Sequence, residues 1–287
     1  MSRAKLAPLG WVLLLCVLVG GAQVALGQAA APAPVATPAT GPAAPAVVTQ
    51  TAVDASLRDD AAVDKMLEAY SPKVRALDQP IGKLIGDLKK GGVGGGSLGN
   101  FVTDGIRAQA SGKLDKPILL AVTNSGGLRK SVIAAGKLTQ RDIFELLPFE
   151  NALVAFDLTG EHVLELLRVV TSHRDAQSGM RITYRVNPDK QLEAESAKFW
   201  IDGVEKEIDL AAIYTVISID YLLNVTGSDY ATVLQKATNT RPLNLTIRDA
   251  ITDYVKAETA AGRDIKSTLD GRFVFDKAAS GGAEEPK

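Results

Sequence analysis

The stretch from Ser97 to Asn151 constrains the fold of this chain more than any other part. It contains a continuous apolar run, Pro117–Val122, which is typical of a strand buried on both faces. Before this run, apolar residues at helical spacing predict an amphipathic helix with Ser97 as its N-cap. After it, glycines predict a turn, and Thr139 can cap a short helix that Pro148 follows. Helices alternating with a buried strand predict a fold of the α/β (α+β) class.

The second half of the chain repeats this alternation. Ile213–Leu223 is a second long apolar run and predicts the other central strand. Thr159 is the expected N-cap of a helix over residues 160–170, and Thr246 begins a capping box for a helix that reaches Ala261. With 287 residues, 46% of them hydrophobic, the chain can bury one core of roughly 200 residues.

The N-terminal residues have the pattern of an export signal. Arg3 and Lys5 precede an apolar run, Leu9–Val19, and small residues precede Gln28. This pattern predicts a signal peptide over residues 1–27, and therefore a protein that is periplasmic or secreted by a bacterium. The alternative is an uncleaved membrane anchor, although the run is shorter than the ~20 apolar residues that a spanning helix needs.

Composition predicts the remaining boundaries. Residues 28–54 form an Ala/Pro-rich linker, because alanine, proline and threonine cannot build a core. Residues 55–77 are an N-terminal helical segment that Pro72 interrupts, residues 78–276 are the folded domain, and residues 277–287 are expected to be a disordered tail. The formal net charge of −1 disfavours nucleic acid as a partner. The single cysteine, Cys16, would be lost with the signal peptide.

Two glycine-containing turns are candidate ligand sites. Residues 124–129 follow the first apolar strand, so this turn and its arginine can bind an anion or an amide, or can be an ordinary tight turn. Gly91–Gly96 could surround a phosphate, but no Gly-Lys-Ser/Thr follows, and a flexible loop is the favoured interpretation. The only histidines, His162 and His173, belong to no metal-site signature, and no Gly-x-Ser-x-Gly motif occurs. We therefore predict no catalytic residue, no metal ligand and no cofactor.

Four motifs in this order resemble the C-terminal, substrate-binding domain of the 5'-nucleotidase family. They are Leu98–Asn100, Thr123–Arg129, Leu147–Asn151 and Thr226–Tyr230. The resemblance extends over residues 78–275 and implies a mixed sheet flanked by helices. It also implies that the catalytic metals belong to a separate N-terminal domain, whose metal-binding signatures this sequence lacks.

The resemblance assigns the ligand-binding residues. Phe149 matches the phenylalanine that stacks on the nucleobase, and Asp229 matches the aspartate that holds the ribose hydroxyls, although Asp229 could equally serve a helix N-terminus. In the Asp229 motif, Tyr230 stands where the family has glycine. The expected ligand-binding residues are Asn124, Gly126, Gly127, Arg129, Phe149, Asn151 and Asp229.

Three departures from the family put ligand binding in question. Glu150 replaces a glycine and would add a charge beside the nucleobase. Leu223 replaces the second stacking phenylalanine, unless Tyr221 or Tyr230 takes its place. The family has phosphate-binding arginines just before the helix that is expected to begin near Ser97. In this chain the nearest cations to that position are the lysines at 89–90.

Three hypotheses about function remain open. The first is that the chain binds a nucleotide, a nucleoside or a related small ligand without hydrolysing it. The second is that the chain is an interaction module with a decayed pocket. The third is that it is the substrate-binding part of a hydrolase of nucleotide catabolism, with a metallophosphatase partner chain that supplies the metals. No membrane contact is expected after signal cleavage.

Overall fold

The computed structural model describes residues 49–201 and 203–285. The chain divides into two compact units, residues 1–58 and residues 59–287. In the first unit, residues 49–58 contain a turn in which Leu57 N donates to Asp54 O over 3.1 Å. The proposed signal peptide lies outside the described residues, as does the proposed linker up to residue 48. The second unit contains all the helices and strands of the described part.

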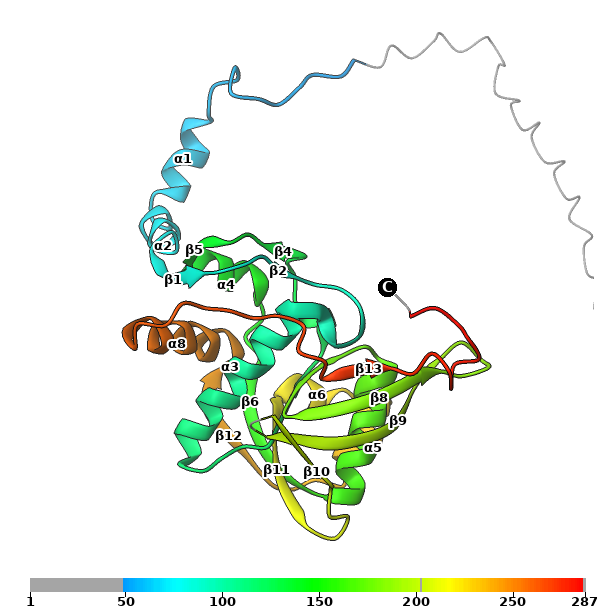
Figure 1. The fold of residues 1–287 in the computed structure, drawn as a ribbon. Coiled ribbons are helices and arrows are strands. Elements are labelled where there is room, and N and C mark those ends of the chain that lie inside the picture. The colour runs from blue at the N-terminus through cyan, green and yellow to red at the C-terminus, as the bar shows by residue number, and fades with distance from the viewer. Residues whose placement is uncertain (1–48, 202, 286–287) are drawn as a thin grey trace, which may run out of the picture. The chain divides into compact units, whose positions relative to one another are not determined.

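The second unit is built on a mixed five-stranded sheet with the order β12-β6-β11-β3-β7. Three neighbouring strands of this sheet, β12, β6 and β11, are labelled in Figure 1. In this sheet β11 pairs parallel with β3 and antiparallel with β6, and β12 and β7 pair antiparallel at the edges. Four successive residues of β11, Val216–Ile219, are buried, as expected of a strand covered on both faces. The strands are β3 (Leu120–Thr123), β6 (Ala152–Thr159), β7 (Ala176–Ser178), β11 (Ile213–Ile219) and β12 (Thr238–Thr246).

Helices pack against this sheet, so the expected mixed sheet flanked by helices is confirmed. α3 (Gly96–Leu114) contacts β3, β7, β11 and α8 (Ile247–Ala260). α5 (Gly160–Ser172) contacts β6, β11 and also β9 of a second sheet. The predicted caps are confirmed, because the Thr159 and Thr246 side chains accept hydrogen bonds from backbone N–H groups of their first helical turns. The other helices are α1 (Ala61–Leu67), α2 (Ser71–Ala76), α4 (Gln140–Leu146), α6 (Asp220–Asn224) and α7 (Asp229–Leu234), with 3-10 turns η1 (Val93–Gly95) and η2 (Ser125–Gly127).

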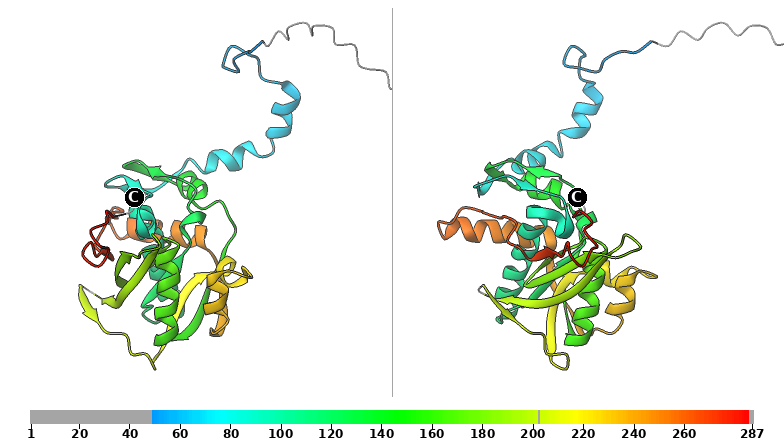
Figure 2. Two further views of the ribbon diagram at one scale, coloured as in Figure 1. Left: turned by 90° about the vertical axis from the view of Figure 1, so that its right-hand side faces the viewer. Right: turned by 45° about the vertical axis from the view of Figure 1, so that its right-hand side comes forward.

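The second sheet has four strands in the order β10-β9-β8-β13, and Figure 2 shows its long β8–β9 hairpin beside α5. β13 comes from the end of the chain and pairs parallel with β8. Two further pairs, β1 with β5 and β2 with β4, are antiparallel. The strands are β1 (Pro80–Leu84), β2 (Leu88–Lys89), β4 (Val132–Ile133), β5 (Gly136–Thr139), β8 (Met180–Val186), β9 (Leu192–Ile201), β10 (Val204–Lys206) and β13 (Phe273–Phe275).

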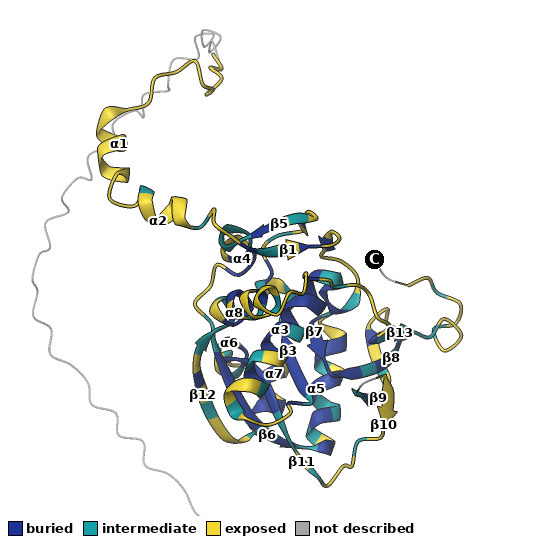
Figure 3. Ribbon diagram, turned by 60° about the vertical axis from the view of Figure 1, so that its left-hand side comes forward, coloured by how far each residue is buried: buried dark blue, intermediate teal, exposed yellow. Residues whose placement is uncertain are grey.

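The residues of the domain include a buried core, whereas the two helices that precede it, α1 and α2, have no buried residue. In Figure 3 the buried residues fill the sheets and the inner faces of α3 and α5, whereas α1 and α2 are exposed. Neither α1 nor α2 contains a buried residue, although their apolar side chains recur at the predicted helical spacing. Within the described part of the chain, no helix is long and apolar enough to cross a bilayer.

Two expectations about local structure were wrong. α3 begins at Gly96 with Gly95 as its N-cap, and Ser97 Oγ instead accepts a hydrogen bond from Lys89 N. The run Ile213–Leu223 is a strand only to Ile219, because α6 begins at Asp220.

The tail after the last strand contains local contacts. Residues 277–285 form turns, and Ser280 Oγ accepts a hydrogen bond from Val186 N over 3.0 Å. Tyr184 also donates its hydroxyl hydrogen to Glu285 Oε1 over 2.6 Å. The expected disorder of this tail in solution stays a prediction.

The second half of the glycine loop before α3 is a packed turn, whereas Gly91 and Gly92 are exposed, and the expected flexibility of the loop stays a prediction. Gly94, Gly95 and Gly96 are buried and have positive φ angles, which glycine adopts without steric cost. A Cβ atom on Gly99 would lie 1.9 Å from Gly94 O, so glycine in the Leu98–Asn100 motif lets this loop contact the first turn of α3. The turn therefore has a packing reason that does not involve a phosphate.

A glycine further along α3 is expected to limit stability. No atom lies within 4 Å of a Cβ placed on Gly112, and glycine in a helix costs about 0.5–1 kcal/mol relative to alanine. Gly112→Ala should therefore raise the melting temperature by roughly 1–4 °C in thermal unfolding followed by circular dichroism. The matched control is Gly105→Ala, whose Cβ would lie 2.6 Å from Ile251 Cδ1 and which should lower it. A lower melting temperature for Gly112→Ala would contradict the helical assignment of this turn.

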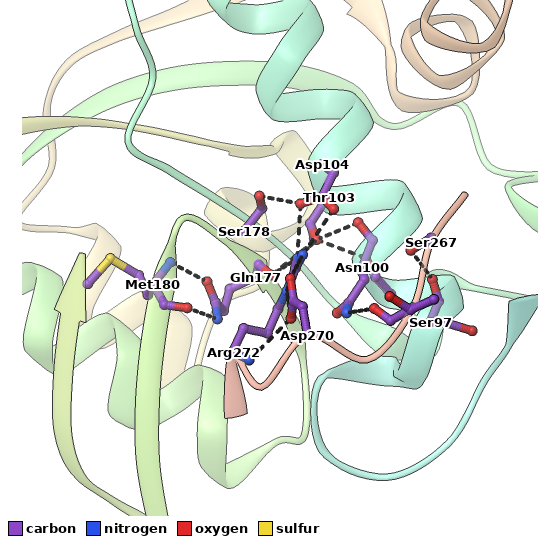
Figure 4. Close-up of polar contacts among 12 residues, drawn as sticks. Ser97, Asn100, Thr103, Asp104, Gln177, Ser178, Met180, Ser267, Asp270 and Arg272 are labelled. Carbon is purple, nitrogen blue, oxygen red and sulfur yellow. Dashed lines mark hydrogen bonds and ion pairs between the residues drawn. The ribbon is translucent and has the colours of Figure 1, made fainter. Parts of the chain in front are cut away.

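A buried arginine connects the end of the chain to α3 and β7. Arg272, which precedes β13, donates to both carboxylate oxygens of Asp270 and to both of Asp104 (Figure 4). It also donates to Gln177 O over 3.0 Å, and Ser178 Oγ donates to Asp104. Burial alone would lower the pKa of Arg272, but the two carboxylates outweigh it and raise that pKa. The guanidinium therefore stays charged and bridges three elements.

Candidate ligand-binding site

The turn after β3 and the loop before β6 enclose a cavity of about 320 Å³, within the size range of small-molecule sites. It lies beyond the carboxyl end of β3, the position where ligands commonly bind in α/β folds. The residues that line it are Asn124, Gly126, Gly127, Arg129, Phe149, Asn151 and Tyr221.

Six of the seven residues expected to bind a ligand therefore line one cavity. The exception is Asp229, which is absent from the lining. The additional residue is Tyr221 on α6, one of the two tyrosines considered as replacements for a second stacking ring. Leu223, at the position of that ring, packs against the core instead. The cavity is lined by two aromatic residues, Phe149 from the loop before β6 and Tyr221 from α6, although only Phe149 follows from the motif.

The Asn124–Gly127 turn shapes one wall of the cavity. Gly127 N donates to Asn124 O over 3.1 Å and closes the turn. A Cβ on Gly127 would lie 3.2 Å from Asn124 Oδ1, so glycine leaves room for the asparagine amide. Asn124 Oδ1 is buried and has no hydrogen-bond partner among the described residues. Because an unpaired buried acceptor costs about 1–3 kcal/mol, a donor from a ligand or water should stabilise this wall.

Arg129 and Phe149 meet at the mouth of the cavity. The guanidinium carbon of Arg129 lies 5.9 Å from the centroid of the Phe149 ring, within the range of a cation–π contact. Arg129 Nη1 donates to Gly126 O over 3.3 Å, so the charge is directed back toward the turn. The exposed fraction is 48% for Phe149 and 49% for Tyr221. These exposed rings offer two stacking surfaces beside one positive charge.

Glu150 does not place its charge in the cavity, which corrects the expectation from sequence. Its carboxylate forms an ion pair with Arg248 of α8, and it is not among the lining residues. Arg248 also donates to Pro148 O over 3.2 Å, and its guanidinium carbon lies 4.6 Å from the centroid of the Phe144 ring. α8 therefore provides a neutralising partner for the one charge that would oppose a nucleobase.

Asp229 is held by a histidine. His173 Nε2 lies 2.9 Å from Asp229 Oδ2, and the Asp229 side chain remains 71% exposed. Its neighbour Tyr230 is buried and donates its hydroxyl hydrogen to Asp175 Oδ2 over 2.7 Å. Tyr230 is therefore part of the core and offers no stacking surface. A contact of Asp229 with a ligand stays a prediction.

The two lysines of the glycine loop also lie outside this cavity. Lys90 Nζ donates to Leu128 O over 2.8 Å, and Lys89 Nζ lies 3.5 Å from Asp87 Oδ2. Both face a separate, open depression beside the start of α3. Arg129 is therefore the only cation that lines the cavity among the described residues.

Within residues 49–201 and 203–285, no three histidine, cysteine, aspartate or glutamate side chains converge as a metal site would require. The metals that a phosphoesterase of this kind uses therefore have no fitting ligand set in the described part. His162 lies on the first turn of α5, and His173 is engaged with Asp229. We derive no metal-dependent step from these residues.

The sequence model of the 5'-nucleotidase C-terminal domain matches residues 78–236. The chain belongs to this family. It is 28% identical over 183 residues to a 5'-nucleotidase of Vibrio vulnificus, covering 62% of this chain and 31% of that protein. It is 27% identical over 232 residues to the endonuclease YhcR of Bacillus subtilis, covering 78% of this chain and 18% of that protein.

Among solved structures, the 5'-nucleotidase precursor of Thermus thermophilus is similar, with a TM-score of 0.61 and 26% identity. The similarity covers 74% of this chain and 42% of the Thermus protein. The NAD nucleotidase of Haemophilus influenzae shares the fold with a TM-score of 0.55 at 19% identity. This 5'-nucleotidase C-terminal chain thus spans less than half the length of each of these relatives. Their complete activities are not transferred to it by similarity alone.

Proposed function

We propose that this chain binds a nucleotide or a nucleoside in the cavity between the Asn124–Gly127 turn and Phe149, and that it does not hydrolyse the ligand by itself. The observation that supports this proposal is that Phe149, Tyr221, Asn151 and Arg129 line a single cavity. An aromatic ring stacks on a nucleobase, an amide pairs with the edge of the base, and a guanidinium binds phosphate oxygens. The ion pair between Glu150 and Arg248 removes the main objection from sequence.

Thermal unfolding with added ligands tests this proposal. AMP, adenosine and UDP-glucose, each supplied at about 100 times its dissociation constant, should stabilise the folded state by about 2.7 kcal/mol. For a domain of this size we expect the melting temperature to rise by roughly 5–10 °C. Inorganic phosphate is the control and should have a much smaller effect.

The outcomes separate the hypotheses. No rise with any of the three compounds would reject nucleotide binding and leave the interaction module, which the exposed apolar side chains of α1 and α2 favour. An equal rise with phosphate would show an anion site without base recognition. Phosphate release from AMP by the purified chain with Mn²⁺ or Zn²⁺ would contradict the absence of hydrolysis.

A second candidate function is the substrate-binding part of a nucleotide hydrolase whose metallophosphatase domain is a separate chain. It is favoured by the match of residues 78–236 to a model of the C-terminal domain of 5'-nucleotidases. In both cases we propose that the protein is periplasmic or secreted, on the basis of the Leu9–Val19 run and the residues that flank it.

A further inference from the structure

Three consecutive residues between α5 and β7, His173, Arg174 and Asp175, contact three segments that lie far apart in the sequence. The carbonyl oxygen of Arg174 accepts hydrogen bonds from Gly94 N over 3.2 Å and from Ser125 Oγ over 2.8 Å. Asp175 accepts one from Ser125 N, and His173 contacts Asp229. Segment 173–175 therefore touches the glycine loop, the η2 turn and the start of α7. No motif in the sequence had marked it.

Of these three residues, Asp175 is the one whose burial is energetically most costly, because its side chain is a carboxylate. Its exposed fraction is 5%, and its two oxygens accept from different elements: Oδ1 from Ser125 N over 2.7 Å, and Oδ2 from the Tyr230 hydroxyl over 2.7 Å. Burial raises the pKa of Asp175, and the hydrogen bonds from Tyr230 and Ser125 offset only part of that effect. A buried carboxylate is costly unless it is hydrogen-bonded, so each of the two bonds offsets part of that cost.

The backbone next to Asp175 is also unusual. Arg174 has a φ of 58°, in the left-handed region that residues other than glycine, asparagine and aspartate rarely adopt. This conformation lets the carbonyl of Arg174 and the side chain of Asp175 both reach Ser125. A non-glycine residue in this region costs of order 1 kcal/mol and persists only where the surrounding contacts hold it.

The partner of Asp175 on α7, Tyr230, departs from the motif of the resembled family. Tyr230 stands where the family resembled in sequence has the last glycine of Thr/Ser-Gly-Gly-Asp-Gly, and glycine has no hydroxyl to donate. The Tyr230 ring is buried, and its pKa is raised by burial and by the charge of Asp175. The link between the η2 turn and α7 therefore depends on a pair of side chains that the family motif does not contain.

We propose that Asp175 is a positioning residue that holds the η2 turn in its cavity-forming conformation and fixes it to Tyr230. Ser125 begins η2, and its neighbours Asn124, Gly126 and Gly127 form the cavity wall. Fixing the Ser125 amide therefore fixes the wall before a ligand arrives, and a preformed site binds more tightly because less order is lost on binding. The consequence for affinity rests on the nucleotide-binding function proposed above, whereas the effect on the turn does not.

Three variants test the role of Asp175 in binding. Asp175→Ala removes both bonds and should weaken AMP binding about tenfold in isothermal titration calorimetry. Asp175→Asn is the conservative control, because its oxygen can accept from Ser125 N while its amide donates to the Tyr230 hydroxyl, and it should restore most of the affinity. Tyr230→Phe removes only the bond to α7 and should have an intermediate effect. Circular dichroism establishes that each variant is folded.

Nuclear magnetic resonance of the ligand-free protein tests the turn independently. The Ser125 backbone amide should change its chemical shift as Asp175 ionises, with a midpoint above the ordinary aspartate value, and Asp175→Asn should abolish this step. The other titratable or charged groups that face Asp175 are His173, Lys90, Tyr230 and its neighbour Arg174. They are unchanged in Asp175→Asn, so a step that persists in this variant belongs to one of them.

The results distinguish failure of this proposal from failure of the proposed function. If folded Asp175→Ala or Tyr230→Phe binds AMP as tightly as the unaltered chain, or if the Ser125 amide titrates identically in Asp175→Asn, the positioning role is overturned. If the unaltered chain binds none of the nucleotides, the proposed function fails, and the amide titration still decides whether Asp175 fixes the turn. If Asp175→Ala does not fold, Asp175→Asn and Tyr230→Phe decide it.

Discussion

Phe149→Ala should remove more than half, and up to nearly all, of the rise in melting temperature that AMP or adenosine produces at about ten times the wild-type dissociation constant. Stacking of a base on an aromatic ring contributes roughly 1–3 kcal/mol, which corresponds to a loss of affinity of about 5- to 150-fold. The Phe149 ring is half-exposed and lines the cavity, so its removal leaves little to disturb in the core. The unliganded melting temperature should therefore change little.

Phe144→Ala is the matched control for this experiment. Phe144 is a phenylalanine of similar exposure, 41%, on α4, and it packs on Arg248 rather than lining the cavity. Its replacement should leave the nucleotide-induced rise intact. An undiminished rise in Phe149→Ala, or an equal loss in both variants, would contradict stacking on Phe149. Tyr221→Ala then tests the second ring, and a partial loss is expected.

Arg272→Met should destabilise the domain by about 2–4 kcal/mol and lower the melting temperature by roughly 5–15 °C. Methionine fills a similar space but leaves Asp104 and Asp270 without their shared cation. Breaking a buried ion pair typically costs about 3–5 kcal/mol, and the lower figure reflects that the two carboxylate side chains are 35% and 37% exposed. Thermal and urea unfolding measure this loss.

The control and the pH dependence make this prediction specific. Arg263→Met removes an exposed pair with Glu258 and should lower the melting temperature far less.

Burial would raise the pKa of Asp270, but the hydrogen bonds and charge of Arg272 outweigh it and lower that pKa. The stabilisation is therefore fully present above the unfolded aspartate value of about 3.9 and is lost as the pH falls through the depressed folded value. The difference between Arg272→Met and wild type should shrink over that acidic interval, and a constant difference would contradict the ion pair.

Sequence reasoning succeeded where the deciding contacts are local. Thr159 and Thr246 are N-caps because each side chain bonds to an amide three residues ahead, which the sequence displays directly. The strand before the Asn124 turn was also predicted, because a continuous apolar run needs a sheet covered on both faces. The four family motifs, in their order along the chain, were sufficient to identify the family. Six of the residues that they named line one cavity in the structure.

Sequence reasoning failed where the deciding contact is distant along the chain. The carboxylate of Glu150 was expected beside a nucleobase, but it pairs with Arg248, 98 residues later. Asp229 contacts His173, 56 residues earlier. Neither pairing has a periodicity or a spacing that a sequence can display, because each depends on tertiary packing that brings distant segments together.

The sequence by itself indicated most of the helices and strands, because hydrophobic periodicity, caps and glycine turns act over a few residues. The family and the residues proposed to bind a nucleotide came from the resemblance of four motifs to a known family. The tertiary structure alone decided that Tyr221 joins the cavity, that Glu150 is neutralised, and that the buried carboxylate of Asp175 ties the η2 turn to α7. These outcomes depend on burial and on hydrogen bonds between segments 50 to 98 residues apart. Such contacts form only when the packed sheets bring those segments together.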